Sequence, residues 1–254
     1  MTLRRTALRS RNIITGILGT ATLVRAQAVG LLIPAHTSPA SSDVACGPRI
    51  PPMVPPNLDE EQQRLYNNIV DTRINIVGEQ ALFDENGALR GPWNPEVASP
   101  ALGQHLERLA TAVRSSNSLE PRLYEVAILV VGVHWQAQFE WYAHEQIARK
   151  AGVAEAAFPL MRERARPERL VGVLREDEAA VYRLAFELME TKRVSSATYV
   201  ETKAILGGDD RKMADLGMTM GCYSAVSTLL NMFEVALPEG VPLPFPEPPT
   251  TRRD

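Results

Sequence analysis

Residues 122–153 read RLYEVAILVVGVHWQAQFEWYAHEQIARKAGV, and the fold is decided in this stretch. The first half is a nearly continuous apolar run that one acid, Glu125, interrupts. The second half repeats apolar residues at helical spacing and ends at Gly152, a residue typical of helix C-termini. The stretch therefore predicts two consecutive helices, with the chain bending or turning back near Gly132 between them.

Two polar residues, Glu140 and His144, lie one turn apart in the second predicted helix, so their side chains share a face. A carboxylate beside an imidazole favours the protonated ring, which can act as a general acid near neutral pH. Glu125 joins this pair only if the chain reverses, because one straight helix would separate Glu125 from His144 by about 28 Å. The residues alone leave three interpretations open: an acid–base pair, a metal site formed with His134, and a solvated surface pair worth about a few tenths of a kcal/mol.

Helical spacing continues on both sides of this stretch. A first helix is predicted from Asn57, whose side chain would cap it together with Glu60 three residues later. A second is predicted from Ser99-Pro100, because proline is common in the first turn of a helix. The apolar positions of this second helix are Leu102, Leu106, Leu109 and Val113. Further helices are expected at about 154–164, 174–192, 195–206 and 210–235.

The sequence contains no period-two strand pattern, no solenoid repeat, no Gly-rich phosphate loop and no Gly-x-Ser-x-Gly elbow. We therefore predict an all-α fold with one domain over residues 57–240. The tail at 241–254 has too many prolines to be helical.

Charge and cysteine content exclude several classes of function. The whole chain has a net charge of −3, and its first 42 residues carry five Arg and no acid, so the remainder nets −8. A nucleic-acid partner is not expected, because binding it requires a basic surface. Only Cys46 and Cys222 are present, with no Cys-x-x-Cys, so neither a disulfide framework nor a thiolate zinc site is predicted. One Cys46–Cys222 bridge stays open in an oxidising compartment.

Residues 1–28 resemble a targeting segment. A basic start, MTLRRTALRSR, is followed by twelve apolar residues at 13–24 and by the small residues of Ala26–Ala28. This order predicts a signal peptide and a secreted or periplasmic protein, and Arg4-Arg5 loosely fits a twin-arginine signal. A mitochondrial transit peptide and a disordered tail are the alternatives. The apolar run is too short for stable membrane insertion, and residues 29–56 are predicted to be an unpacked Pro/Ser-rich linker.

The central stretch resembles the signature region of the carboxymuconolactone decarboxylase family, whose members have the AhpD-like fold. The family's glutamate in an E-x-A-I-L helix corresponds to Glu125. Its second motif, Y/F-E-W-x-x-H-x-x-x-A-x-x-A-G, is matched here by Phe139, Glu140, Trp141, His144, Ala148, Ala151 and Gly152. The segments GPWNPEVASPALG and NMFEVALPEG are similar to flanking parts of the family, so the resemblance spans about residues 50–245.

This resemblance implies an AhpD-like helical bundle with a central helical hairpin that assembles as a homo-oligomer, a trimer or hexamer. One branch of the family uses a Cys-x-x-Cys pair, but the matching positions here are Ala137 and Glu140, so dithiol peroxidase chemistry is not implied. The other branch, the decarboxylase, needs no cofactor and acts in aromatic compound catabolism. We therefore expect a lyase for a small carboxylated lactone or aromatic-derived metabolite. The alternatives are a non-catalytic ligand-binding oligomer and a thiol-independent antioxidant protein.

The resemblance also assigns roles to individual residues. His144 is expected to be the acid–base residue, with Glu140 orienting and charging it and Glu125 closing the network from the preceding helix. The residues expected to contact the small-molecule substrate are His134, Trp135 and Trp141. No metal is expected. An exported enzyme also leaves room for another lactone, a quinone or a phenolic metabolite as substrate.

Overall fold

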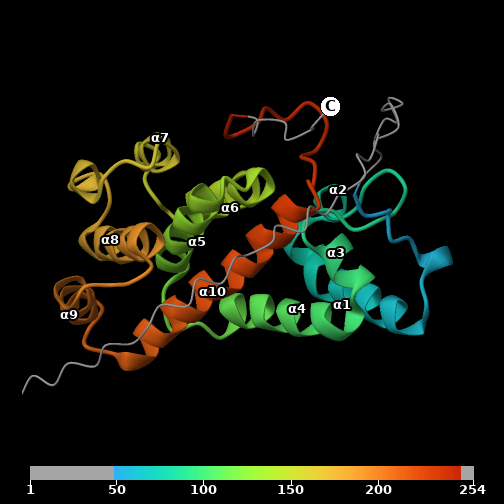
Figure 1. Ribbon diagram of the computed structural model, residues 1–254, viewed down its shortest axis with the longest axis horizontal. Helices are drawn as coiled ribbons and strands as arrows, with labels where there is room; N and C mark the ends of the chain where they lie inside the picture. Colours follow the sequence, from blue (N-terminus) through green and yellow to red (C-terminus); the bar gives the residue numbers. More distant parts are fainter. Residues whose placement is uncertain (1–48, 247–254) are drawn as a thin grey trace, which may run out of the picture. The chain divides into compact units, whose positions relative to one another are not determined.

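Two helices form a central hairpin in the computed structural model, which describes residues 49–246 (Figure 1). Helix α5 (Pro121–Trp135) and helix α6 (Gln138–Lys150) pack against each other, and Gly152 follows α6 with a φ of 94°. The described residues form helices and two isolated bridges but no strand. The all-α prediction and the predicted hairpin are therefore confirmed over this part of the chain.

The chain reverses four residues later than the sequence predicts. Helix α5 runs without a break through Gly132 to Trp135, so the predicted bend at Gly132 is wrong. The reversal occurs at Gln136, which has a left-handed φ of 49°, and the next N–H, of Ala137, donates to the Gly132 carbonyl at 2.9 Å. Gly132 serves the contact between the helices instead, because a Cβ there would lie 3.3 Å from Cγ of Glu140.

Within the described residues, helices lie on both sides of the hairpin in the sequence. The preceding ones are α1 (Glu60–Val77), α2 (Glu79–Leu82), α3 (Trp93–Ala98) and α4 (Pro100–Ser115). The following ones are α7 (Ala157–Arg162), α8 (Glu176–Thr191), α9 (Ser196–Ile205) and α10 (Asp210–Met232). Short 3-10 turns lie at Pro55–Asn57 and Pro167–Leu170. Helix α10 packs along α5 and also contacts α4 and α6, so it joins the hairpin to the N-terminal helices (Figure 1).

Helix α5 is buried on all sides, from Leu123 to Val133 without exception. A helix that is apolar around its whole circumference needs neighbours on every face, and α6, α8 and α10 supply them. The aliphatic residues of α5 join the main core with side chains such as Tyr182 of α8 and Val226 of α10. Each large apolar side chain buried in this way contributes roughly 1.5–3 kcal/mol. The same packing carries Glu125 into the core.

The residue that caps the first helix lies two positions beyond the predicted one. Asp59, and not Asn57, caps α1: its carboxylate accepts from the Gln62 N–H at 2.9 Å, and the Gln62 side chain accepts from the Asp59 N–H at 3.0 Å. Asn57 instead ends the 3-10 turn that starts at Pro55. The turn holds the chain at Leu58 in an extended conformation, so helical hydrogen bonding begins only after it.

The end of the predicted linker is packed. Asn94 accepts from the Met53 N–H at 2.8 Å and donates to the Pro51 carbonyl at 3.1 Å. Met53 also packs against a smaller apolar cluster built from α1, α2 and α3. The folded region therefore starts before residue 57, because these contacts order the Pro-rich segment. The predicted signal segment at 1–28 and Cys46 lie outside the described residues.

The predicted apolar face of α4 is confirmed only in part, because Val113 is buried and Leu106 packs against the core but the other two leucines do not. Leu102 and Leu109 are exposed, whereas Gly103 and Glu107 are buried. Glu107 Oε1 accepts from Nε of Arg73 in α1 at 2.9 Å, and Gly103 lies directly against the backbone of α3. Because Arg73 and Glu107 pair with each other in the interior, the face of α4 that carries Glu107 turns toward α1, and Leu102 and Leu109 turn away.

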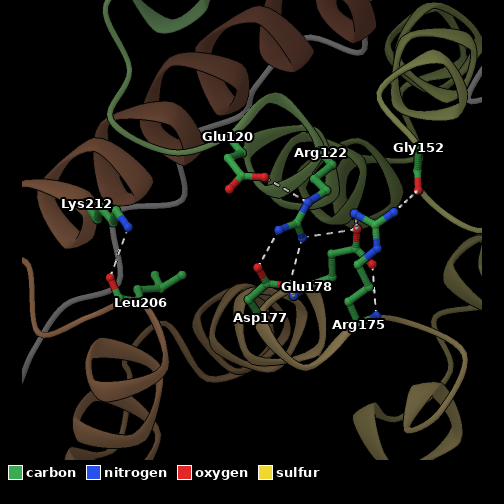
Figure 2. Close-up of polar contacts among 8 residues, drawn as sticks. All are labelled: Glu120, Arg122, Gly152, Arg175, Asp177, Glu178, Leu206 and Lys212. Carbon is green, nitrogen blue, oxygen red and sulfur yellow. Dashed lines mark hydrogen bonds and ion pairs between the residues drawn. The ribbon is translucent and has the colours of Figure 1, made fainter.

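Arg122, at the start of α5, ties this helix to the start of α8 (Figure 2). Its guanidinium donates to both carboxylate oxygens of Asp177, at 2.7 and 2.5 Å, and to Glu178 at 3.3 Å. Its Nε donates to Glu120 at 3.1 Å. The hydrogen bonds from Arg122 lower the pKa of Asp177. The network therefore anchors the N-terminal end of the helix that carries Glu125.

The described part of the Pro-rich tail docks on α6. The Gln138 side chain makes two hydrogen bonds with the backbone of Phe245, at 2.9 and 3.0 Å. The Phe245 ring meets Trp141 edge to face, with 5.7 Å between ring centroids. Up to residue 246 the tail contains no helix, as its prolines predict. None of the helices between residues 49 and 246 is long and apolar enough to cross a membrane.

Substituting Gly103 tests the contact between α3 and α4. In Gly103→Ala the new Cβ would lie 2.2 Å from the Glu96 carbonyl oxygen, so we expect a loss of about 1–3 kcal/mol from overpacking. The matched control is Gly221→Ala in α10, where no atom lies within 4 Å of the added Cβ and helix propensity should add about 0.5–1 kcal/mol. Urea unfolding of both variants measures the change in the free energy of unfolding relative to wild type. A gain in stability in both variants would contradict the close contact at Gly103.

Replacing Arg122 tests the anchor of α5. Arg122→Met should destabilise the protein by about 2–4 kcal/mol, because the buried Glu178 loses its nearest cation and Asp177 loses both of its hydrogen bonds from Arg122. The control is Arg183→Met, which removes a more exposed pair with Glu201 and should cost less than about 1 kcal/mol.

The Arg122 effect should also depend on pH. The depressed Asp177 pKa stabilises the fold fully above its ordinary value of 3.8, and the effect is lost as pH falls through the lower folded value. The stability gap between wild type and Arg122→Met should therefore narrow below about pH 4. A gap that stays constant between pH 7 and pH 3 would show that Asp177 is not held by Arg122.

Candidate active site

Three titratable side chains meet between α5 and α6. Nδ1 of His144 lies 2.7 Å from Oε2 of Glu125, and Nε2 of the same ring lies 3.4 Å from Oε1 of Glu140. Glu125 comes from α5, and Glu140 and His144 lie one turn apart on α6. Each ring nitrogen therefore faces a different carboxylate, an arrangement that the chain reversal at Gln136 makes possible.

The cluster is buried. Glu125 is 0% exposed, Glu140 3% and His144 5%. The interpretation of Glu140 and His144 as a solvated surface pair is therefore wrong. Buried ionisable groups are costly unless they are paired, and here three of them are kept in one place.

The two carboxylates hold the ring in different ways. The short contact from Glu125 to Nδ1 fixes the orientation of the imidazole. The contact from Glu140 is long, and Oε1 of Glu140 has no hydrogen-bond partner among the described residues. Burial raises the pKa of Glu140 to about 7, although His144 lowers it in part. Glu140 therefore exchanges its proton close to neutral pH, beside a ring nitrogen.

Two further residues complete the cluster, and the sequence did not indicate either. The Tyr223 ring, from α10, meets the His144 ring edge to face with centroids 4.8 Å apart. Arg114, from the last turn of α4, places a guanidinium nitrogen 3.7 Å from Oε1 of Glu125. Burial raises the pKa of the Tyr223 hydroxyl well above its usual range, so it stays protonated at neutral pH. No local motif marks these residues, because both reach the cluster from helices distant in sequence.

The cysteine nearest to this cluster is a poor nucleophile. Cys222 is buried next to Tyr223 on α10. Burial raises the pKa of its thiol to about 12, and the carboxylates of Glu140, Glu96 and Glu107 add to the effect. The thiolate is the reactive form of cysteine, so Cys222 stays in its unreactive form at neutral pH.

The residues predicted to contact substrate do not join the cluster. His134 follows Glu125 by nine positions, which is half a turn out of phase, so it lies on the opposite side of α5. Its Nε2 lies 3.1 Å from Nζ of Lys192, beside a cavity of about 10 Å³ that has room for one water molecule. Trp135 is exposed at the end of α5. Trp141 is fully buried, and its ring packs on Phe245.

The alternative metal site is not assembled. His134 lies on the far side of α5 from Glu140 and His144, so the three proposed ligands do not converge. Among residues 49–246 there is no group of three or more His, Cys, Asp or Glu side chains placed to hold a metal ion.

Solved structures with a similar arrangement of helices exist. A protein of unknown function from Agrobacterium tumefaciens, described as a candidate antioxidant-defence protein AhpD, is 20% identical with a TM-score of 0.50. The match covers 57% of this chain and 96% of that one. A peroxidase-related protein from Ralstonia eutropha, with an alkylhydroperoxidase AhpD core, is 12% identical with a TM-score of 0.58, covering 76% and 93% of the two chains. A peroxidase-related protein from Silicibacter is 11% identical with a TM-score of 0.54, covering 74% and 91%.

Sequence comparison adds no closer relative. No protein-family model matches the chain, and no curated protein matches it. At identities of 11–20% the structural likeness speaks for the fold and not for an activity. The expectation from the sequence resemblance is thereby confirmed at the level of architecture: this protein has the AhpD-like all-α fold.

Proposed function

We propose that this protein is a cofactor-independent lyase that acts on a small carboxylated lactone or aromatic-derived metabolite by acid–base catalysis. One observation carries the proposal: both ring nitrogens of His144 lie against buried carboxylates, Glu125 and Glu140. A surface imidazole would not need two such partners. Groups with perturbed pKa values, gathered in one buried cluster, are typical of sites that transfer protons.

The reaction requires a proton donor and a place for negative charge. When the carbon–carbon bond to a carboxylate breaks, carbon dioxide leaves and the electron pair stays on the ring system as an enolate. The protonated imidazole of His144 stabilises this charge and then delivers its proton to carbon. Glu125 holds the Nδ1 side of the ring in place during both steps. Protonation of the enolate balances the reaction and releases the decarboxylated product.

Glu140 has the right chemistry to restore the proton. Burial raises its pKa to about 7, so both its protonated and its ionised forms are accessible near neutral pH. It faces Nε2 of His144 at 3.4 Å, a separation that a small movement of either side chain would close to a hydrogen bond. Glu140 therefore recharges the imidazole after each turnover, while solvent supplies the net proton.

A peroxidase-like antioxidant function is the second candidate, since the solved structures with the same fold are described as peroxidase-related or as an AhpD protein. The dithiol positions here hold Ala137 and Glu140, and the raised pKa of Cys222 disfavours a thiolate mechanism. Such an activity would have to be independent of cysteine. Reduction of an organic hydroperoxide at the expense of an added two-electron donor, by the purified protein and by Cys222→Ala alike and without release of carbon dioxide, would favour this function.

Replacing His144 tests the proposed lyase. A screen of carboxylated lactones and phenolic acids for carbon dioxide release identifies a substrate. With that substrate, kcat/KM of His144→Gln should fall by at least about 100-fold, because the proton donor is lost. The matched control is His105→Gln on the exposed side of α4, which should retain wild-type activity. Undiminished turnover by a folded His144→Gln protein would refute the proposed role.

The titration of Glu140 affects stability in a defined direction. Its carboxyl loses its proton near pH 4.5 in the unfolded chain and near pH 7 in the folded protein. Between these values the folded state holds the extra proton. Stability from this group is therefore complete below about pH 4.5 and declines as pH rises through about 7.

Glu140→Gln should remove this decline, because an amide does not ionise. We expect the variant to gain stability relative to wild type between pH 5 and pH 8, by about 2–3 kcal/mol. Denaturant unfolding at the two pH values measures the gain, with Glu61→Gln on the exposed face of α1 as the control. If both variants follow the wild-type pH dependence, Glu140 does not titrate in this range.

A further inference from the structure

Arg114 differs from Arg73 and Arg122, two other arginines of the described residues that are largely shielded from solvent. Arg73 donates to Glu107 at 2.9 Å and to Thr111 at 3.0 Å, and Arg122 donates to three carboxylates. The Arg114 guanidinium makes no hydrogen bond to any residue between 49 and 246, and its nearest carboxylate oxygen, Oε1 of Glu125, lies 3.7 Å away. A guanidinium carries five N–H donors, and the nitrogen nearest to Glu125 lies beside its carboxylate without a hydrogen bond to it.

The carboxylate on the other side of this gap is also incompletely paired. Oε2 of Glu125 contacts His144, but Oε1 of Glu125 has no hydrogen-bond partner among the described residues. Donors on Arg114 and an acceptor on Glu125 therefore face each other across a distance too long for a hydrogen bond. If the pair were purely structural, it would be expected to close to about 2.8–2.9 Å.

Arg114 also has a more solvent-exposed side chain than the three residues of the cluster. Its side chain is 21% exposed, compared with 0% for Glu125, 3% for Glu140 and 6% for His144. Of these four side chains, Arg114 is therefore the one most accessible to a molecule in solvent. Burial lowers the pKa of Arg114, but the nearby Tyr223, Glu125, Tyr124 and Glu140 raise it by more, so the group stays cationic.

We propose that Arg114 is the specificity-determining residue that binds a carboxylate of the substrate and presents the rest of the molecule to His144. The planar fork of a guanidinium matches the two oxygens of a carboxylate, and the charge-assisted hydrogen bonds are strong. The bound carboxylate is one that the reaction retains, because a cation on the departing group would stabilise the reactant more than the transition state. This assignment rests on the proposed function and adds the group that selects anionic substrates.

The first test uses binding and needs no turnover. Benzoate and benzamide have nearly the same shape, but only benzoate carries a carboxylate. We expect wild-type protein to bind benzoate more tightly than benzamide in calorimetric titrations. In Arg114→Gln the Kd for benzoate should rise by about 10- to 100-fold, while the Kd for benzamide stays unchanged. Arg114→Lys should show intermediate affinity, because it keeps the charge but loses the fork.

The controls separate recognition from a structural role. Arg108→Gln removes an exposed cation from the same helix and should leave both Kd values unchanged. Thermal unfolding of each variant establishes whether it is folded. If Arg114→Gln does not fold, the Kd values are compared between wild type and Arg114→Lys instead. If Arg114 only neutralised Glu125, its replacement would lower stability without changing the preference for benzoate over benzamide. That result, or equal binding of the two ligands by wild type, would overturn the assignment.

Turnover then separates this assignment from the proposed lyase. With a substrate from the carbon dioxide screen, Arg114→Gln should raise KM more than it lowers kcat, whereas His144→Gln should lower kcat. Loss of turnover in His144→Gln with an unchanged KM in Arg114→Gln would leave the lyase standing and refute the role of Arg114. Carboxylate binding that depends on Arg114, in a protein whose turnover survives His144→Gln, would refute the lyase mechanism and retain the binding site.

Discussion

The contact between Glu125 of α5 and His144 of α6 is the interaction on which the site depends. At 2.7 Å it connects the two arms of the central hairpin inside the core. A lone carboxylate in such a place would be strongly destabilising, and so would a lone imidazolium. Pairing offsets the cost of burying the two groups only while α5 and α6 keep their register. The close approach at Gly132, where a side chain would press on Glu140, maintains that register.

The protein keeps an unusual amount of charge in its interior. Besides the site, Arg73 and Glu107 form a buried pair between α1 and α4. Glu96 of α3 lies close enough that burial and the charge of Glu107 raise its pKa to about 9. Replacing such groups by apolar ones often stabilises a protein. The interior therefore holds a second group of ionisable side chains apart from the cluster around His144.

Arg122 and Arg114 show two uses of the same residue type near α5. Arg122 donates hydrogen bonds to Glu120, Asp177 and Glu178 and so fixes the start of α5. Arg114 approaches the same helix one turn further on but leaves its donors unpaired toward Glu125. The first is part of the scaffold. The second is the residue that we propose binds a substrate carboxylate. Its side chain is more exposed to solvent than those of Glu125, Glu140 and His144.

Most of the helices, and their order, follow from the local pattern of the sequence, but the short helices α2 and α3 do not. Apolar spacing is a local property, so it correctly indicated the all-α class, the start of α4 at Pro100 and the end of α6 near Gly152. It also placed Glu140 and His144 on one helical face. It misplaced the chain reversal at Gly132, the cap of α1 and the first part of the inward face of α4, because each of these depends on contacts made elsewhere.

Which polar side chains share the site depends on how the helices pack in the tertiary structure. Glu125 reaches His144 because α5 continues to Trp135 before the chain turns, and His134 is excluded because it lies half a turn out of phase on the same helix. Arg114 and Tyr223 arrive from α4 and α10. Nothing in their local sequence marks them. Burial, charge pairing and access to solvent are set by segments distant along the chain, so they become visible only once those segments pack together.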